Sequence, residues 1–155
     1  MKNIGFLGCG KIGQALLAHV KEQGYGEVIF IEDPFVELQG EPVVRGIEEE
    51  LYEKTQLIVE CATADVLKEH IDIILKHSDL LMFSVTAFSD MEFAEHADEL
   101  CRKYNRHIYL PHGAILGLDG IFDGRKVWNE VNIITTKSPK SLGRTDVEKT
   151  VVYEG

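Results

Sequence analysis

The chain has 155 residues, 45% hydrophobic and 27% charged, which is typical of a globular protein with one good core, or one domain plus part of a second. No apolar run reaches the ~18 residues of a membrane helix, and the start, MKNIGFLG, lacks the layout of a signal peptide, so we expect a cytoplasmic protein. The net charge of −10 argues against a nucleic-acid partner, and the scattered Cys9, Cys61 and Cys101 indicate neither disulfides nor a metal site.

Short apolar runs alternate with helical patterns up to about residue 110. In chain order, the expected strands are Asn3–Leu7, Val28–Ile31, Val43–Val44, Leu57–Glu60, Leu80–Ser84 and Ile108–Leu110. The expected helices are Lys11–Gln23, a short acidic one at Ile47–Lys54, Asp65–His77, and one that Asp90 caps and that runs to about Tyr104. Apolar strands separated by amphipathic helices indicate an α/β fold, a doubly wound parallel sheet of the Rossmann type.

Two of these helices have apolar stripes that we expect to face the sheet. In the first helix the stripe comprises Ile12, Ala15, Leu16 and Val20. In the Asp65–His77 helix it comprises Leu67, Ile71, Ile74 and Leu75. Gly24 and Gly26 are expected to end the first helix.

The pattern changes after Pro111, which we take as the approximate domain boundary. The segment PHGAILGLDG (111–120) is rich in glycine and shows little periodicity, and Val131–Thr136 and Thr150–Tyr153 are predicted strands. Residues 1–100 hold 7 basic and 20 acidic residues, whereas residues 101–155 hold 9 basic and 6 acidic ones. This asymmetry indicates either a second surface that favours an anion or simply a solvated basic face.

The segment GFLGCGKIGQALLAHV (5–20) contains a GxGxxG spacing at Gly8, Gly10 and Gly13. A strand before it, a helix after it and an acidic residue ending the next strand are the setting of a dinucleotide-binding turn. Gly8 permits the tight turn, Gly10 lets the backbone approach a pyrophosphate, and Gly13 lets the helix pack close to the strand. The N–H groups at the helix start then face the anion. A strand–turn–helix that binds no nucleotide is the alternative.

Two adjacent carboxylates end the second predicted strand. Glu32 follows Gly13 by 19 residues, where a carboxylate accepts hydrogen bonds from the hydroxyls of the adenosine ribose. Asp33 is the rival for this role. Since a 2′-phosphate would meet a like charge there, the sequence favours NAD as cofactor, with NADP as the alternative.

Four further segments narrow the function: VECATADVLKEH (59–70), SVTAFSD (84–90), PHGAILGLDG (111–120) and TTKSPKSLG (135–143). Together with the glycine motif and KTVVYEG (149–155), they resemble the L-aspartate dehydrogenase family, in order along essentially the whole chain. The resemblance implies NAD(P)-dependent oxidation of L-aspartate to iminoaspartate, which yields oxaloacetate and ammonia. It also implies an NAD(P)-binding Rossmann domain at 1–110 and the incomplete start of a substrate and dimerisation domain at 111–155.

The resemblance also assigns residues to the cofactor. Those that would hold the pyrophosphate are Gly8, Gly10, Lys11, Ile12 and Gly13, with Glu32 at the ribose. Those that follow two neighbouring strands at their carboxyl ends, where open α/β sheets bind ligands, are Cys61, Ala62, Val85, Thr86 and Ala87. Those that would pack near the nicotinamide are Gly113 and Ala114.

The chain departs from the family in two places. His112 stands where the family commonly has serine; it is a candidate for binding a substrate carboxylate or moving a proton, or else a residue that only packs or faces solvent. Beyond Gly155 the family continues with a cofactor-binding asparagine and the catalytic histidine, which have no counterpart here. The catalytic residues thus stay unassigned. We expect this chain to be a truncated protein or one half of a split enzyme, with little turnover by itself.

Two other functions stay open. One is a dehydrogenase for another amino acid or a semialdehyde, and the other is a non-catalytic NAD-binding or regulatory module. The expected partners are a small-molecule substrate, L-aspartate, and either a second copy of the chain, bound through residues 111–155, or a C-terminal half supplied in trans. We expect no metal, nucleic acid or membrane partner.

Overall fold

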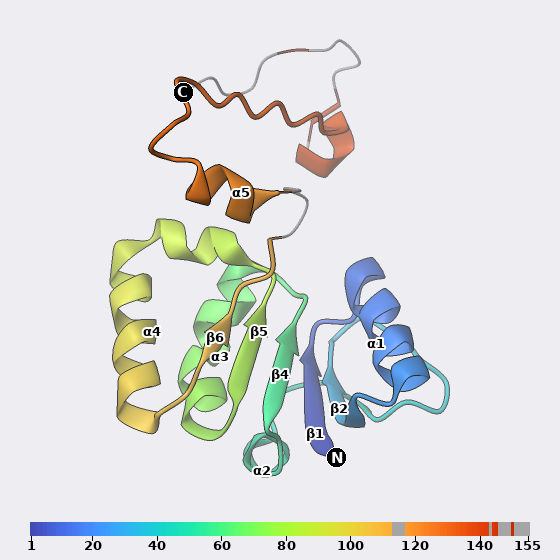
Figure 1. Ribbon diagram of the computed structural model, residues 1–155. Helices are drawn as coiled ribbons and strands as arrows, with labels where there is room; N and C mark the ends of the chain where they lie inside the picture. Colours follow the sequence, from blue (N-terminus) through green and yellow to red (C-terminus); the bar gives the residue numbers. More distant parts are fainter. Residues whose placement is uncertain (113–116, 143, 146–149, 151–155) are drawn as a thin grey trace. The chain divides into compact units, whose positions relative to one another are not determined.

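The computed structural model describes residues 1–112, 117–142, 144–145 and 150, and the chain divides into two compact units, Met1–Ala114 and Ile115–Gly155. The larger unit is built on a six-stranded sheet in the order β3-β2-β1-β4-β5-β6, in which every neighbouring pair is parallel (Figure 1). The strand order reverses direction between β1 and β4, which makes the sheet doubly wound. The predicted Rossmann-type α/β fold is confirmed.

The elements of the larger unit follow the predicted order. The strands are β1 (Lys2–Leu7), β2 (Gly26–Glu32), β3 (Val43–Val44), β4 (Leu57–Glu60), β5 (Asp79–Met82) and β6 (Ile108–Tyr109). The helices are α1 (Lys11–Gln23), α2 (Glu49–Glu53), α3 (Ala64–His77) and α4 (Met91–Tyr104), with a 3-10 turn, η1 (Val85–Ser89), after β5. Phe83 and Ser84, expected in a strand, lie beyond β5, because their N–H groups bond to the Glu60 carboxylate.

Helix α1 is rotated relative to the stripe that its sequence predicts. Of the predicted stripe, Leu16 and Val20 are partly buried and pack against the core, but Ile12 is 60% exposed and Ala15 is exposed as well. Gly13 and Leu17 are buried instead. A Cβ on Gly13 would lie 2.9 Å from the Gly8 carbonyl oxygen, so α1 approaches the turn closely at this glycine. Gly24 ends α1 in a left-handed conformation (φ 65°) as predicted, while Gly26 begins β2.

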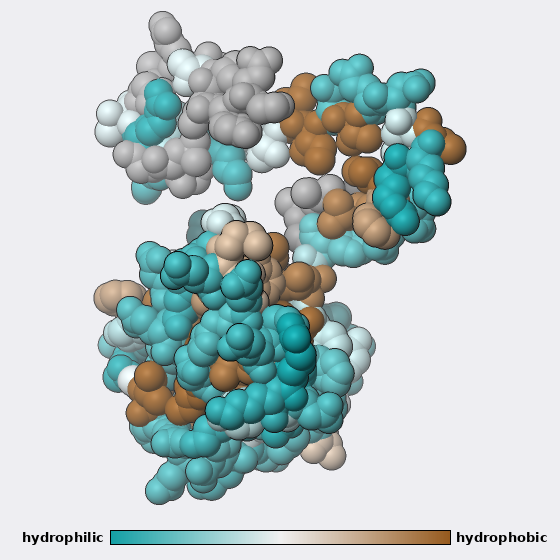
Figure 2. All heavy atoms as spheres, turned by 90° about the vertical axis from the view of Figure 1, so that its left-hand side faces the viewer, coloured by the Kyte–Doolittle hydropathy of each residue, from teal (hydrophilic) through white to brown (hydrophobic). Residues whose placement is uncertain are grey.

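Two cores lie on opposite faces of the sheet, because successive side chains of a strand point to opposite faces. Phe30 packs with residues of α2, α3 and α4, whereas Ile31 packs with Leu17 of α1. In α3 the predicted stripe is confirmed and is joined by His70. Figure 2 views the larger unit from the α4 side, where its surface is mostly hydrophilic.

The smaller unit has little regular structure among its described residues. It contains a short helix, α5 (Leu118–Asp123), in a segment that shows no clear periodicity, and a 3-10 turn, η2 (Pro139–Leu142). The predicted strand Val131–Thr136 is wrong: these residues form no strand and are exposed, since no described strand of this unit lies beside them. Of the predicted strand Thr150–Tyr153, residues 151–153 lie outside the described residues.

The domain roles assigned to residues 1–110 and 111–155 stay predictions. Within the described part of the chain, no helix is long and apolar enough to cross a membrane.

Candidate functional site

The glycine motif forms the turn between β1 and α1, at the carboxyl edge of the sheet. Gly8 has φ +79°, a conformation that side-chain-bearing residues rarely adopt, and its N–H donates to the Glu32 carbonyl oxygen at 2.8 Å. A Cβ on Gly8 would lie 2.7 Å from the Cα of Ala62. Gly8 is therefore required twice, for the turn itself and for the contact with the segment after β4.

Gly10 is required for neither reason. Its φ is −67°, which any residue adopts, and apart from its two chain neighbours no atom of the described residues lies within 4 Å of the position where its Cβ would be. The open space lies over the start of α1, beside the exposed Lys11 and Ile12. A glycine that folding does not need, next to open space at a helix N-terminus, is consistent with close approach of a ligand.

The N-terminus of α1 differs from those of the other two long helices. Thr63 caps α3 and Asp90 caps α4 through side-chain hydrogen bonds, and each of these helices has an acidic residue in its first turn. Helix α1 has Gly10 at its N-cap position, with no side-chain cap and no acidic residue in its first turn. Its first N–H groups and the positive end of its dipole are thus available to an anion such as a pyrophosphate.

The Glu32 side chain is buried on the α3 face of the sheet. One carboxylate oxygen accepts a hydrogen bond from the Tyr52 hydroxyl at 2.7 Å, and the other lies 2.7 Å from Nε2 of His70. Nδ1 of His70 lies 2.7 Å from the Val66 carbonyl oxygen, which can only accept, so Nδ1 carries a proton. Both oxygens of Glu32 are therefore engaged inside the protein.

The Asp33 side chain lies instead at the glycine turn. Its Oδ2 accepts from the N–H of Cys9 at 2.8 Å, and its Oδ1 accepts from the N–H groups of Phe35 and Val36 at 2.8 and 3.0 Å. Burial alone would raise the pKa of Asp33, but these donors and the nearby Arg45 outweigh it and hold the pKa below its usual value. Asp33 is thus an ionised carboxylate in contact with the predicted phosphate loop.

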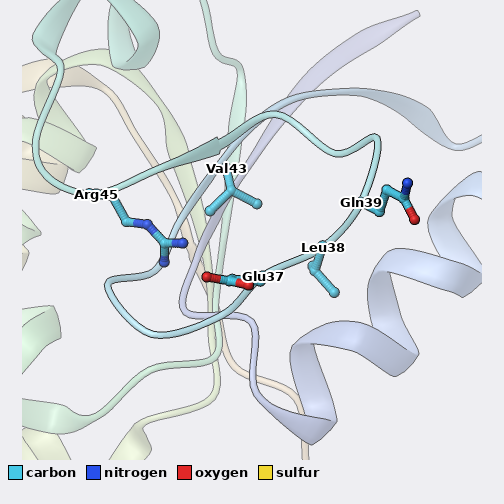
Figure 3. A pocket seen from close by; sticks show the side chains of 5 residues that line it. All are labelled: Glu37, Leu38, Gln39, Val43 and Arg45. Carbon is cyan, nitrogen blue, oxygen red and sulfur yellow. The ribbon is translucent and has the colours of Figure 1, made fainter.

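A pocket of about 440 Å³ lies between the β2–β3 loop and β3 (Figure 3). Its lining residues are Glu37, Leu38, Gln39, Val43 and Arg45. The Glu37 and Arg45 side chains point toward each other, and Arg45 Nη1 donates to the Asp33 carbonyl oxygen at 2.9 Å. The pocket therefore adjoins Asp33 at the end of β2.

Glu60 links the carboxyl ends of β4 and β5 through hydrogen bonds to its side chain. The sequence motifs did not single this residue out. Its carboxylate is fully buried and accepts hydrogen bonds from Ala62, Phe83 and Ser84. The signal in the sequence was an acidic residue ending the otherwise apolar strand LIVE.

The remaining predicted residues lie in different surroundings. Cys61 is partly buried, and burial together with the Glu60 carboxylate raises the pKa of its thiol to about 12, so the thiol stays protonated. In η1, Val85 and Thr86 are exposed but Ala87 is buried. His112 is exposed, and Gly113 and Ala114 lie outside the described residues.

One cluster of potential metal ligands occurs in the described part of the chain. Glu49, Glu53 and His77 place ligand atoms within 4.8 Å of one another. Both glutamates are exposed, and Lys76 Nζ lies 2.7 Å from Glu49 Oε1. The cluster is accounted for as a surface ion-pair group.

Comparison with known proteins agrees with this geometry. Residues 8–111 match the family described as "Homoserine dehydrogenase, NAD binding domain". The chain is 36% identical to the L-aspartate dehydrogenase of Archaeoglobus fulgidus over 98% of this chain and 62% of that protein. It is 34% identical to the L-aspartate dehydrogenase of Thermotoga maritima over 96% of this chain and 60% of that protein. The chain thus spans less than two thirds of the length of these relatives.

Solved structures give the same picture. The crystal structure of the aspartate dehydrogenase from Thermotoga maritima matches with a TM-score of 0.74 and 30% identity, covering 100% of this chain and 64% of that one. The WlbA dehydrogenase from Thermus thermophilus, in complex with NAD and α-ketoglutarate, has a TM-score of 0.63 and 16% identity over 84% of this chain and 48% of that one. The second match shows the fold alone. The resemblance to L-aspartate dehydrogenases that the motifs predict is confirmed.

Proposed function

Because the chain belongs to the family of homoserine-dehydrogenase-type NAD-binding domains, we propose that it binds NAD for the oxidation of L-aspartate. L-Aspartate dehydrogenase is the name of relatives that match almost the whole of this chain. In this reaction L-aspartate loses a hydride and a proton and becomes iminoaspartate, and hydrolysis of the imine gives oxaloacetate and ammonia. NAD, when bound, supplies the hydride acceptor.

One observation carries the proposal: an uncapped helix start, a glycine with open space above it and an ionised carboxylate meet at the point where the strand order reverses. The N–H groups at the start of α1 would hold the pyrophosphate, with Gly10 allowing its close approach. Lys11 and Ile12 are exposed at the same helix start.

We assign the ribose to Asp33, the rival that the sequence left open. Its carboxylate is held at the glycine turn by N–H groups, whereas the carboxylate of Glu32 is enclosed by Tyr52 and His70. A ribose hydroxyl would donate to the Asp33 carboxylate, and a 2′-phosphate would be repelled by it. This supports NAD over NADP.

For the nicotinamide half of the cofactor we propose the segments after β4 and β5, with Cys61, Ala62, Val85 and Thr86. They lie at the carboxyl ends of β4, which pairs with β1, and of β5, which pairs with β4, on the far side of the switch point from β2. Gly113 and Ala114 remain predicted neighbours of the nicotinamide, and His112 a predicted contact of the substrate.

The two carboxylates ending β2 can be distinguished by substitution. We expect Asp33→Asn to shift the ratio of NADH to NADPH affinity toward NADPH by about tenfold, because a charge that repels the 2′-phosphate is removed. Glu32→Gln should leave that ratio unchanged, although it disturbs a buried network. Calorimetric titration of both variants and the wild type with each coenzyme measures the two ratios. A shift in Glu32→Gln alone would return the ribose role to Glu32.

The activity is tested by L-aspartate-dependent reduction of NAD, followed by the absorbance of NADH. Reduction with L-aspartate but not with other amino acids or semialdehydes supports the proposal. Reduction with a different substrate of that panel would identify another dehydrogenase. Tight NADH binding without turnover on any substrate would favour a non-catalytic NAD-binding module.

We propose that the protein works in the cytoplasm and as a homodimer or with a partner chain. Three free cysteines support a reducing compartment. Large apolar side chains exposed in the smaller unit, such as Phe122 and Ile134, support association.

A further inference from the structure

Glu60 carries the most completely enclosed carboxylate near the proposed cofactor site. Its Oε1 accepts from the Ala62 N–H at 2.8 Å and from the Ser84 hydroxyl at 2.7 Å. Its Oε2 accepts from the N–H groups of Phe83 and Ser84 at 3.1 and 2.8 Å. The residue has 0% exposure, so these donors replace the water that an ionised carboxylate would otherwise bind.

No cation balances this carboxylate: within the part of the chain that the structure describes, no ion pair includes Glu60. Three of its four donors are backbone N–H or hydroxyl groups of the segment after β5, and the fourth is the N–H of Ala62 after β4. The desolvation of such a carboxylate offsets much of what these hydrogen bonds contribute to stability, although an apolar replacement would leave the buried N–H groups without an acceptor. What it does supply is a fixed geometry between two segments of irregular backbone.

The segment after β4 is in turn in contact with the phosphate loop. A Cβ on Gly8 would lie 2.7 to 2.8 Å from Cα, Cβ and N of Ala62, so the two backbones lie as close as a glycine allows. The N–H of Cys61 donates to the Leu7 carbonyl oxygen at 2.8 Å, directly before Gly8. The Glu60 carboxylate therefore joins the segment after β4 to Phe83 and Ser84, directly before η1, while the backbone at Ala62 lies against the glycine turn.

We propose that Glu60 is a positioning residue that holds the segments after β4 and β5 in the arrangement that receives the nicotinamide half of the cofactor. The inference rests on the proposed function. Glu60 itself touches no ligand in this scheme, because it is fully enclosed; it acts through Ala62 and through the start of η1. The pyrophosphate and ribose contacts, which depend on α1 and Asp33, do not require it.

Glu60→Gln changes the hydrogen bonds of the side chain at residue 60 in a defined way. The amide oxygen of glutamine replaces Oε2 and still accepts from Phe83 and Ser84. Its NH₂ group then replaces Oε1, where the Ser84 hydroxyl can turn to accept but the Ala62 N–H cannot, since two donors would face each other. The substitution should thus release Ala62 selectively.

The experiment compares ADP-ribose with NADH, by calorimetric titration of the full chain. ADP-ribose lacks the nicotinamide ring, so the difference between the two affinities reports on the contacts of that ring. For Glu60→Gln we expect NADH affinity to fall about tenfold while ADP-ribose affinity stays within about twofold of the wild-type value. Amide hydrogen exchange by NMR should accelerate at Ala62 and stay slow at Phe83, which a general loss of stability would not produce.

Two milder variants serve as a matched pair at the two ends of β5. Ser84→Ala removes one hydrogen bond to Glu60, and Ser78→Ala removes the buried bond from Ser78 Oγ to the Thr55 carbonyl oxygen at the opposite edge of the sheet. Ser84→Ala should lower NADH affinity severalfold and spare ADP-ribose, and Ser78→Ala should change neither affinity. If Glu60→Gln does not fold, this pair decides the question.

The outcomes separate this inference from the function on which it rests. If the wild type binds neither ADP-ribose nor NADH, the proposed function fails, and the inference fails with it. If the wild type binds both ligands, and the ratio of NADH affinity to ADP-ribose affinity in Glu60→Gln and in Ser84→Ala equals the wild-type ratio, the proposed function stands and the positioning role of Glu60 is overturned. A fall in NADH affinity with unchanged ADP-ribose affinity in both variants supports the positioning role of Glu60.

Discussion

At the scale of single residues, the three glycines of the motif serve different physical purposes. Gly8 and Gly13 are required by the fold itself, because a Cβ on either would collide with backbone atoms. A Cβ on Gly10 would meet open space, so the fold itself does not require a glycine there. This difference separates the residues that keep the turn folded from the residue that leaves room for a ligand.

Substitution can distinguish these purposes. Gly10→Ala should reduce NADH affinity by at least about tenfold with little change in melting temperature, because the methyl group would occupy space meant for the pyrophosphate. Gly13→Ala should lower the melting temperature itself, since its Cβ would lie 2.9 Å from the Gly8 carbonyl oxygen. Calorimetric titration and thermal unfolding of both variants measure the two effects. Unchanged NADH binding by Gly10→Ala would contradict the assignment of the phosphate site.

His70 is the residue from which a pH dependence of stability is expected. Burial alone would lower its pKa, but the hydrogen bond and charge of Glu32, the Val66 carbonyl and the nearby Glu69 outweigh it and raise the pKa above the usual value. Tyr52 also contacts Glu32, and the pKa of its phenol is raised, so it stays neutral.

A raised pKa means that the folded protein binds the His70 proton more tightly than the unfolded chain does. The stabilisation is then fully present below about pH 6.5, the ordinary histidine value, and is lost as the pH rises through the raised pKa. Thermal unfolding of the wild type and His70→Gln across this range should show the largest difference at low pH and a shrinking one above it. A difference that grows with pH would mean that His70 is neutral in the folded protein.

At the scale of elements, the ends of the helices separate structural helices from the one proposed to bind a ligand. Asp90 caps α4 by accepting from the Phe93 N–H at 3.2 Å, and it also pairs with Lys68 of α3 at 2.6 Å. The bond from Lys68 and then that from Phe93 hold the pKa of Asp90 below its usual value. Helix α1 has no such cap.

We expect Asp90→Ala to lower the melting temperature by a few degrees, whereas Asp90→Asn should recover most of the loss. Asparagine still caps the helix but removes the charge that pairs with Lys68, so the pair of variants separates the cap from the ion pair. Because the pKa of Asp90 is lowered, the difference between wild type and Asp90→Ala should fade as the pH falls through that pKa. Thermal unfolding at neutral and acidic pH measures it. Equal losses in both variants would assign the effect to the ion pair.

At the scale of the whole molecule, the two units differ in how well they cover their apolar side chains. The larger unit encloses two cores, one on each face of its sheet. In the smaller unit, Phe122 is 62% exposed, Val127 73%, Trp128 53% and Ile134 89%. Figure 2 shows hydrophobic side chains at the surface of both units. Exposed apolar groups of this size favour association.

We therefore expect the chain to dimerise or associate at micromolar concentration through the smaller unit. Light scattering of the wild type measures the mass in solution, and replacing Val127 and Ile134 with Ser should shift it toward the monomer. The large exposed fractions of these two side chains make the replacement compatible with folding. A strictly monomeric wild type would contradict this expectation.

The sequence by itself determined the order of strands and helices in residues 1–110 and the doubly wound sheet. It also determined the N-cap of α4 at Asp90 and the position of the glycine turn. These follow from local spacing, because apolar periodicity, a capping carboxylate and glycines at a tight turn act over a few residues. The same local signals failed at Val131–Thr136, where a β-rich sequence has no described strand beside it to complete its hydrogen bonds.

Only the tertiary structure decided which of two adjacent carboxylates faces the glycine turn. The Glu32 carboxylate contacts Tyr52 and His70, whereas that of Asp33 contacts Cys9, and all three partners are distant in the sequence. It also decided which side of α1 is buried, with Gly13 and Leu17 inside and Ile12 exposed, and the hydrogen bonds that the Glu60 carboxylate accepts. A local pattern cannot encode such contacts, because they exist only once separate strands end side by side at one edge of the sheet.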